Sequence, residues 1–205
     1  MALINQANKE IQLKIVYYGP PQGGKTTNLE KAFAEVETTT AGAKGKLTSL
    51  ATNTDRTLFF DFLPIETTAI KGYKTKFQLF TVPGQVIYNA TRQLVLRGVD
   101  GLVFVADSQY EKMEENVQTF ANMIDNLETL NLRLENIPYV LQYNKRDLPN
   151  AAPVDYMDYL LNNRDVQVPA FPSAVVKGDG VLETLNTITR MLLHKLLSET
   201  SRKAA

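Results

Sequence analysis

Gly19–Pro20–Pro21–Gln22–Gly23–Gly24–Lys25–Thr26–Thr27 is the stretch that decides the fold of this chain. Two glycines separated by four residues are followed directly by Lys and Thr. Glycine tolerates the backbone angles and the close approach that let a loop turn its N–H groups toward phosphate oxygens. In this pattern the lysine ammonium contacts the β- and γ-phosphates, and the threonine hydroxyl binds Mg²⁺. The predicted nucleotide ligands in the loop are Gly19, Gln22, Gly23, Gly24, Lys25, Thr26 and Thr27.

A phosphate-binding loop of this kind needs a strand before it and a helix after it. Ile11–Tyr18 has the pattern of a strand, and Thr26–Glu35 that of a helix whose N-terminus favours anions. Extended apolar runs alternate with helical runs along the rest of the chain, which indicates a sheet covered by helices on both faces. Further strands are expected at 58–63, 74–82, 101–107, 138–144 and 170–175, and further helices at 110–130, 153–161 and 180–198.

The link Pro64–Tyr73 is too short for a helical crossover, so the strands on either side of it are expected to form an antiparallel hairpin. The predicted fold is therefore α/β, a three-layer P-loop NTPase with a mostly parallel six-stranded sheet that contains one antiparallel strand. The segments 36–57 and 83–98 lack periodicity and are expected to be irregular functional connections. Residues 1–198 are expected to form a single domain, and residues 199–205 a disordered tail.

Composition excludes several classes of function. The 205 residues carry 22 basic and 22 acidic side chains and no cysteine, so neither a nucleic-acid surface, a disulfide framework nor a thiolate metal site is expected. No signal peptide, membrane span or site for a lipid anchor is apparent, which favours a cytoplasmic protein. The single histidine, His194, lies among apolar residues of a predicted helix, where a structural role is expected.

A second motif, Asn144–Lys145–Arg146–Asp147, follows a predicted strand. Guanine presents two adjacent donors that one carboxylate accepts, whereas adenine would leave Asp147 facing a lone pair. A site built on such hydrogen bonds rejects the wrong base strongly. Asn144 is expected to hold the edge of the purine and to brace the phosphate loop, and the stem of Lys145 to cover the base. Ser173–Ala174 adds a candidate backbone N–H for the guanine oxygen.

Both motifs resemble those of Ras-like small GTPases, and the resemblance extends over nearly the full chain. The individual residues are most similar to those of the MglA family of gliding-motility GTPases. The resemblance implies a Ras-like G domain with GTP or GDP and Mg²⁺ as its ligands. It also implies a switch whose GTP form binds polarity or motility effectors at a cell pole, and whose hydrolysis is stimulated by a roadblock-type MglB partner. The residues that carry it are 14–20, 24–29, 44–47, 55–64, 81–85 and 142–149.

The resemblance also implies catalytic roles. Gln85 follows Gly84 at the position from which a Ras-like glutamine orients the attacking water, and Lys25 contributes charge at the phosphates. Gly84 itself is a candidate nucleotide ligand. Arg56 is the candidate internal arginine finger, because its planar charged fork suits the charge that spreads over the γ-phosphoryl oxygens.

Ras-like proteins carry Asp where this chain and the MglA family have Thr81, so another acid is needed near Mg²⁺. Asp61 lies in an apolar strand and is a candidate to act through a water, the alternative being an outward-facing side chain on an edge strand. Thr57, or alternatively Thr54, is the candidate to complete the metal shell beside Thr26.

Pro21 and Gln22 occupy loop positions where relatives carry small residues. Proline removes one N–H and adds bulk beside the γ-phosphate, so it either crowds Gln85 or stiffens the loop. Three readings follow. The first is a GTP-hydrolysing switch, and the alternative is a GTP-bound scaffold with negligible turnover. A nucleotide kinase fits poorly, because the chain shows no arginine-rich lid.

Overall fold

The computed structural model describes residues 3–39, 48–51, 57–70, 72–85 and 88–203. Its strands are β1 (Leu3–Asn5), β2 (Glu10–Tyr18), β3 (Thr48–Ala51), β4 (Thr57–Ile70), β5 (Tyr73–Thr81), β6 (Gly101–Asp107), β7 (Tyr139–Asn144) and β8 (Ala170–Pro172). Its α-helices are α1 (Lys25–Thr39), α2 (Asn89–Leu96), α3 (Met113–Thr129), α4 (Val154–Leu161) and α5 (Val181–Lys203), and short 3₁₀ helices begin at Tyr110, Leu134 and Val175.

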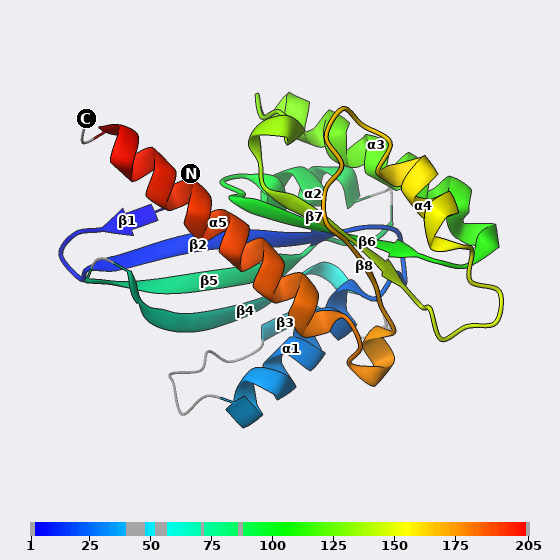
Figure 1. The fold of residues 1–205 in the computed structure, drawn as a ribbon, viewed down its shortest axis with the longest axis horizontal. Helices are drawn as coiled ribbons and strands as arrows, with labels where there is room; N and C mark the ends of the chain where they lie inside the picture. The colour runs from blue at the N-terminus through cyan, green and yellow to red at the C-terminus, as the bar shows by residue number, and fades with distance from the viewer. Residues whose placement is uncertain (1–2, 40–47, 52–56, 71, 86–87, 204–205) are drawn as a thin grey trace.

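The strands form one sheet in the order β3-β4-β5-β2-β6-β7-β8, with β1 paired to β2 (Figure 1). The run from β5 to β8 is parallel, and β4 lies antiparallel to β5, as the short link between them predicted. The six strands expected from the sequence are all present. The sheet nevertheless has eight strands in the described residues, because β1 and β3 add antiparallel pairs. Each is too short for its alternation to be recognised in the sequence.

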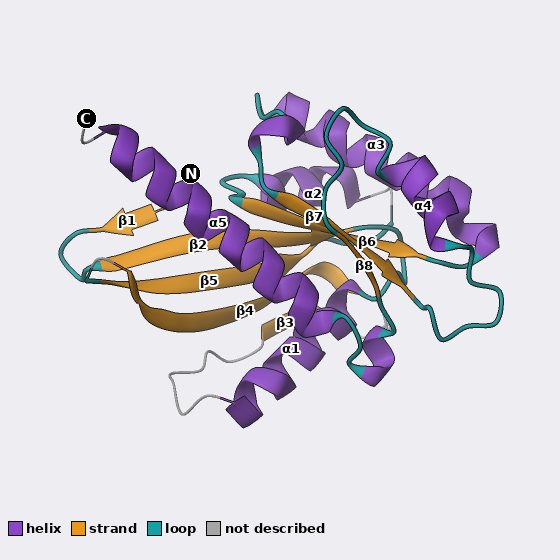
Figure 2. Ribbon diagram, viewed as in Figure 1, coloured by secondary structure: helices purple, strands orange, loops and turns teal. Residues whose placement is uncertain are grey.

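Helices cover both faces of the sheet, which confirms the three-layer α/β/α architecture (Figure 2). Successive side chains of a strand point to opposite faces. In β2, Ile15 and Tyr17 pack with α1 and α5, whereas Val16 and Tyr18 pack with α2, α3 and α4. The Met and aromatic side chains of α3 are core residues as expected, although Val117 is 40% exposed. Helix α5 extends to Lys203, beyond the Ser198 boundary that the sequence suggested.

Segment 83–98 is not irregular throughout, because it contains α2. The sequence conceals this helix, since the residue that faces the core one turn before Leu96 is Arg92 rather than an apolar side chain. Apolar periodicity, the main signal of an amphipathic helix, is therefore interrupted. Segment 36–57 likewise contains the C-terminal end of α1 and the strand β3.

The carboxyl ends of the parallel strands meet at one edge of the sheet. The phosphate loop follows Tyr18, the segment from Val82 to Gln85 follows β5, and Asp107 and Asn144 close β6 and β7 in register with each other. Ser173 follows β8. Open α/β sheets bind ligands beyond this edge. The topology thus gathers motifs that lie more than a hundred residues apart in the sequence.

Candidate functional site

The loop after β2 has the geometry of a phosphate cradle. Gly19 and Gly24 adopt φ values of 148° and 102°, and Gln22 adopts 56°. A Cβ atom added at Gly24 would lie 2.2 Å from Nδ2 of Asn144. That position accepts only glycine, because a side chain would be both strained and in collision with the amide from the second motif.

Lys25 is 6% exposed and lies over its own loop. Its ammonium donates to the carbonyl oxygens of Gly19 at 3.0 Å and Pro20 at 2.6 Å. These bonds hold a buried positive charge at the N-terminus of α1, where helix and loop N–H groups also favour anions. The arrangement can bind a polyphosphate.

A cavity of about 670 Å³ opens beside the loop. It is large enough for part of a nucleotide, since small-molecule sites span roughly 300–1,000 Å³. The segment after β5 forms its other wall, so the predicted water-orienting Gln85 shares a cavity with Lys25. The lining residues are Pro21, Gln22, Gly24, Lys25, Thr26, Thr27, Val82, Gly84, Gln85 and Tyr88.

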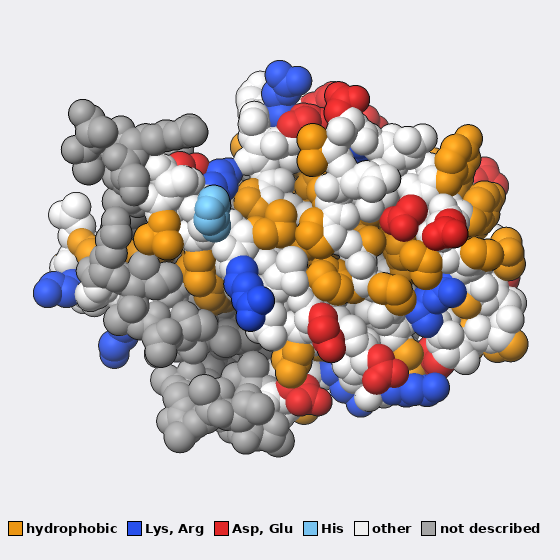
Figure 3. Space-filling model, viewed as in Figure 1, with side chains coloured by type: hydrophobic (Ala, Val, Ile, Leu, Met, Phe, Trp, Pro, Cys, Tyr) orange, Lys and Arg blue, Asp and Glu red, His pale blue; other side chains and the backbone are white. Residues whose placement is uncertain are grey.

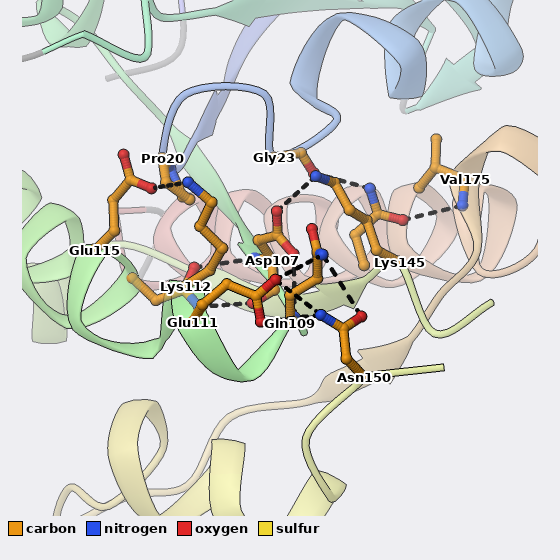
Figure 4. Close-up of polar contacts among 12 residues, drawn as sticks. Pro20, Gly23, Asp107, Gln109, Glu111, Lys112, Glu115, Lys145, Asn150 and Val175 are labelled. Atoms are coloured by element: carbon orange, nitrogen blue, oxygen red, sulfur yellow. Dashed lines mark hydrogen bonds and ion pairs between the residues drawn. The ribbon is translucent and has the colours of Figure 1, made fainter. Parts of the chain in front are cut away.

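Asn144 bridges the two motifs. Its Nδ2 donates to the Gly23 carbonyl at 2.8 Å, and its Oδ1 accepts from the N–H of Val175 at 3.0 Å. Lys145 has a φ of 66° and forms a 2.6 Å ion pair with Asp107, whose side chain is 1% exposed (Figure 4). This pair orients the lysine at the end of β7.

The remaining residues predicted to bind the base lie at the same edge. Asp147 is exposed, and the backbone of its neighbour Arg146 donates to the Ser173 carbonyl at 2.9 Å. Ser173 and Ala174 are buried, and Ser173 N–H donates to Tyr143. A backbone hydrogen bond therefore links the loop after β7 to the loop after β8, and the carboxylate of Asp147 is exposed beside it.

The sequence profile of the ADP-ribosylation factor family matches residues 1–192 of this chain. The chain belongs to that family of small GTPases. A relative from Myxococcus xanthus (strain DK1622), the mutual gliding-motility protein MglA, is 52% identical over 196 residues, which cover 96% of this chain and 98% of the relative. The family resemblance inferred from the motifs is thereby confirmed, and guanine nucleotide is the ligand class of the family.

Pro21 of this GTPase contacts the segment after β5 through its backbone. A Cβ atom added at Gly84 would lie 2.4 Å from Cα and 2.7 Å from N of Pro21. Only glycine permits this approach. The two walls of the cavity touch at Pro21 and Gly84, and Gln85 is the next residue along the chain. Pro21 and Gln85 line the same cavity.

The metal and finger candidates fall in a segment that is only partly described. Thr57 begins β4 and pairs with Ala51, whereas Thr54 and Arg56 lie outside the described residues. Asp61 pairs with Ser49 of β3. The edge-strand alternative for Asp61 is wrong, because β4 lies between β3 and β5.

Several polar residues of the site had no role assigned from sequence. Asn28 is fully buried, donates to the Gly24 carbonyl at 3.0 Å and exchanges two amide hydrogen bonds with Gln142 at 2.7 and 3.0 Å. Gln142 also donates to Thr184 Oγ1 at 3.1 Å. This pair fastens α1 to β7 and α5. The sequence signal for these residues is a polar side chain within an element that is otherwise buried, as with Asn28 and Gln142. Asp107 at the end of an apolar strand is a similar signal.

The surface outside the site is mixed in character. On the face that carries α5, basic, acidic and hydrophobic side chains are interspersed, and His194 is exposed there (Figure 3). None of the described helices combines the length and apolarity needed to span a bilayer. In the same described part of the chain, no group of three or more His, Asp or Glu side chains gathers to hold a metal.

Proposed function

We propose that this GTPase is an MglA-type GTP/GDP switch for cell polarity or gliding motility, activated by an MglB-type roadblock protein and binding polarity or motility effectors in its GTP state. The observation that carries the proposal is the 52% identity to the gliding-motility relative over almost the whole of both chains. We place it in the cytoplasm, recruited by partners to a cell pole. GTP would order the segments 36–57 and 83–98 by contacts to the γ-phosphate and Mg²⁺, and hydrolysis would release them.

The loop and the base motif have separate tasks in this proposal. Gly19, Gly23 and Gly24 present N–H groups to the phosphates, with Gln22 and Thr27 in the same loop. Lys25 lies where its ammonium can neutralise the β- and γ-phosphates. Asp147 accepts from the two donors of guanine, Lys145 covers the base, and Ala174 donates to the guanine oxygen. Asn144 links the base motif to the phosphate loop through its hydrogen bond to the Gly23 carbonyl.

Hydrolysis in this proposal requires only positioning and charge. Gln85 holds the attacking water from the wall opposite Lys25, and Arg56 stabilises the charge on the γ-phosphoryl oxygens. Both act on a phosphate that the loop already holds, so their removal affects turnover more than binding. Gly84 offers its N–H from the same wall.

The residues present fit a Mg²⁺ ion bound mainly through the nucleotide. Thr26 lines the cavity beside Lys25, and hydroxyl oxygens suit this hard cation. When held there, Mg²⁺ would neutralise part of the phosphate charge. Thr57, or alternatively Thr54, supplies the second hydroxyl. These assignments explain why no cage of acidic side chains is required.

We assign to Asp61 the task of the carboxylate that is missing at Thr81, acting on the metal through a water. Phe62 of β4 pairs with Phe80 of β5 in an antiparallel register. Asp61 precedes Phe62 on β4, and Thr81 follows Phe80 on β5, so both residues are adjacent to this paired position. The acid is therefore offered from the neighbouring strand instead of from β5 itself.

Asp61→Asn is expected to raise the Mg²⁺ concentration needed to retain GDP by about 10- to 100-fold. Losing one charge-assisted hydrogen bond costs about 1.5–3 kcal/mol. A Mg²⁺ titration of fluorescent GDP release measures the effect. Glu66→Gln is the matched control, because Glu66 lies on the same strand opposite Lys76, far along β4. An unchanged titration in Asp61→Asn would remove this assignment.

The switch itself is tested by single-turnover GTP hydrolysis with and without an MglB-type roadblock protein. We expect a slow intrinsic rate and a marked acceleration by the partner, without acceleration of ATP hydrolysis. A GTP-bound scaffold, the alternative reading, would show nucleotide binding but no acceleration. Binding of ATP as tightly as GTP would contradict both readings.

A further inference from the structure

Arg92 of α2 is a buried cation without a carboxylate partner among the described residues. Its side chain is among the largest that are fully enclosed, and it is 1% exposed. Burying an unpaired charge is costly unless hydrogen bonds replace its hydration. A charge retained in such a place is expected to perform a task that an apolar side chain cannot.

The guanidinium of Arg92 holds two successive carbonyl groups of the segment after β5. Nε donates to the Pro83 oxygen at 2.9 Å, and Nη2 donates to the Gly84 oxygen. A planar fork with fixed donor directions suits this double contact, which a lysine ammonium cannot reproduce. Nη1 donates to Oδ1 of Asn122 on α3 at 2.6 Å.

Arg92 and Asn122 also contact Tyr18, the last residue of the strand before the phosphate loop. The Cζ atom of Arg92 lies 5.4 Å from the ring centroid of Tyr18, within the range of a cation–π contact. Tyr18 hydroxyl donates to Asn122 at 2.7 Å and accepts from Asn126 at 3.0 Å. Burial raises the pKa of Tyr18, so this hydroxyl stays protonated and can donate.

Fixing these carbonyls also fixes the adjacent N–H groups. In a planar trans peptide, the C=O and N–H bonds point in opposite directions. The carbonyls of Pro83 and Gly84 face Arg92, so the N–H groups of Gly84 and Gln85 point away from it. Gly84 and Gln85 line the cavity that Lys25 also lines, while Arg92 is enclosed behind them.

We infer that Arg92 is a positioning residue for GTP hydrolysis, one that holds the Pro83–Gly84 turn from behind so that Gly84 and Gln85 face the phosphate site. The inference rests on the proposed catalytic role of Gln85. Thr81 replaces the acid that tethers this segment through the metal in Ras-like proteins. Arg92 instead holds the Pro83–Gly84 turn from the side away from the cavity. Its own contacts are with α3 and with the strand before the phosphate loop.

The test compares Arg92→Met and Arg92→Lys in the full chain loaded with GTP. Both are expected to lower the single-turnover hydrolysis rate, by on the order of 10²-fold for the Met variant, because small displacements of a catalytic group have effects of this size. Affinity for fluorescent GDP should stay unchanged. Deuterium exchange should become faster in residues 84–88 and remain as in wild type in β6 and β7.

Arg97→Met is the matched control. Arg97 caps the same helix but its side chain is exposed, so hydrolysis and exchange should match wild type. Arg92→Lys keeps the buried charge but loses the planar guanidinium that bonds both carbonyl groups. The hydrolysis and exchange rates of this variant decide the test if Arg92→Met folds poorly.

Wild-type hydrolysis and exchange in Arg92→Lys would overturn the inference. So would faster exchange throughout β6 and β7 with loss of GDP affinity, which marks a purely structural role. Faster exchange in residues 84–88 with unchanged turnover would also overturn it. Failure of the proposed function is distinguishable, because the wild-type chain itself would then show no hydrolysis that the roadblock partner accelerates.

Discussion

Arg56→Ala is expected to reduce single-turnover GTP hydrolysis by on the order of 10³-fold or more, with GDP and GTP affinities unchanged. The charge that develops on the γ-phosphoryl oxygens in the transition state would lose its planar cationic partner, whereas the ground-state contacts of the phosphate loop would remain. Rapid-mixing measurements with preloaded GTP, in the presence and absence of the proposed roadblock partner, give the rates.

Two further variants sharpen this result. Gln85→Ala should also spare affinity and slow hydrolysis, because it removes from the cavity wall the amide that we propose orients the attacking water. Arg133→Ala removes an arginine side chain that is 79% exposed and forms a 3.8 Å ion pair with Glu135, so it should behave as wild type. If Arg56→Ala turns over at the wild-type rate, the finger assignment is wrong.

Asp147→Asn is expected to weaken GTP binding by on the order of 10²- to 10⁴-fold. Two hydrogen bonds to a charged acceptor are lost, each contributing about 1.5–3 kcal/mol. Xanthine carries a carbonyl where guanine carries its amine, and the amide of Asn can donate to it. The same substitution should therefore improve binding of xanthosine triphosphate. Competition against fluorescent GDP measures both affinities.

The control for the base site is Asp155→Asn, since Asp155 is an exposed acid in the first turn of α4 with the same charge change. It should leave the order of nucleotide preference as it is in wild type. Retained preference of Asp147→Asn for GTP over ATP and xanthosine triphosphate would exclude Asp147 as the residue that reads guanine.

The order of the six longer strands, and the meeting of the two sequence motifs at one edge of the sheet, could be predicted from the sequence. The sequence predicts a strand at Gly101–Asp107 with the bounds that the structure shows, and all seven of its residues are buried. Such a continuous apolar run carries its own signal. The β4–β5 hairpin followed from the length of one link, and the site followed from two motifs placed at strand ends.

The errors share a physical cause. Strands β1 and β3 have three and four residues, and their pairing depends on partners elsewhere in the sheet. Helix α2 was hidden because a buried cation occupies a core position. The edge-strand alternative for Asp61 depended on the neighbours of β4, which no local pattern encodes.

Local patterns along this chain are enough to establish a guanine-nucleotide switch fold, because the phosphate loop and the base motif are short and their residue types are set by the ligand. The contacts that join these parts are different. Asn28 and Gln142 are 114 positions apart, Tyr18 and Asn126 are 108 apart, and Arg92 reaches α3 across 30 residues. Only folding brings such pairs together. The tertiary structure therefore assigns Arg92 its place behind the Pro83–Gly84 turn.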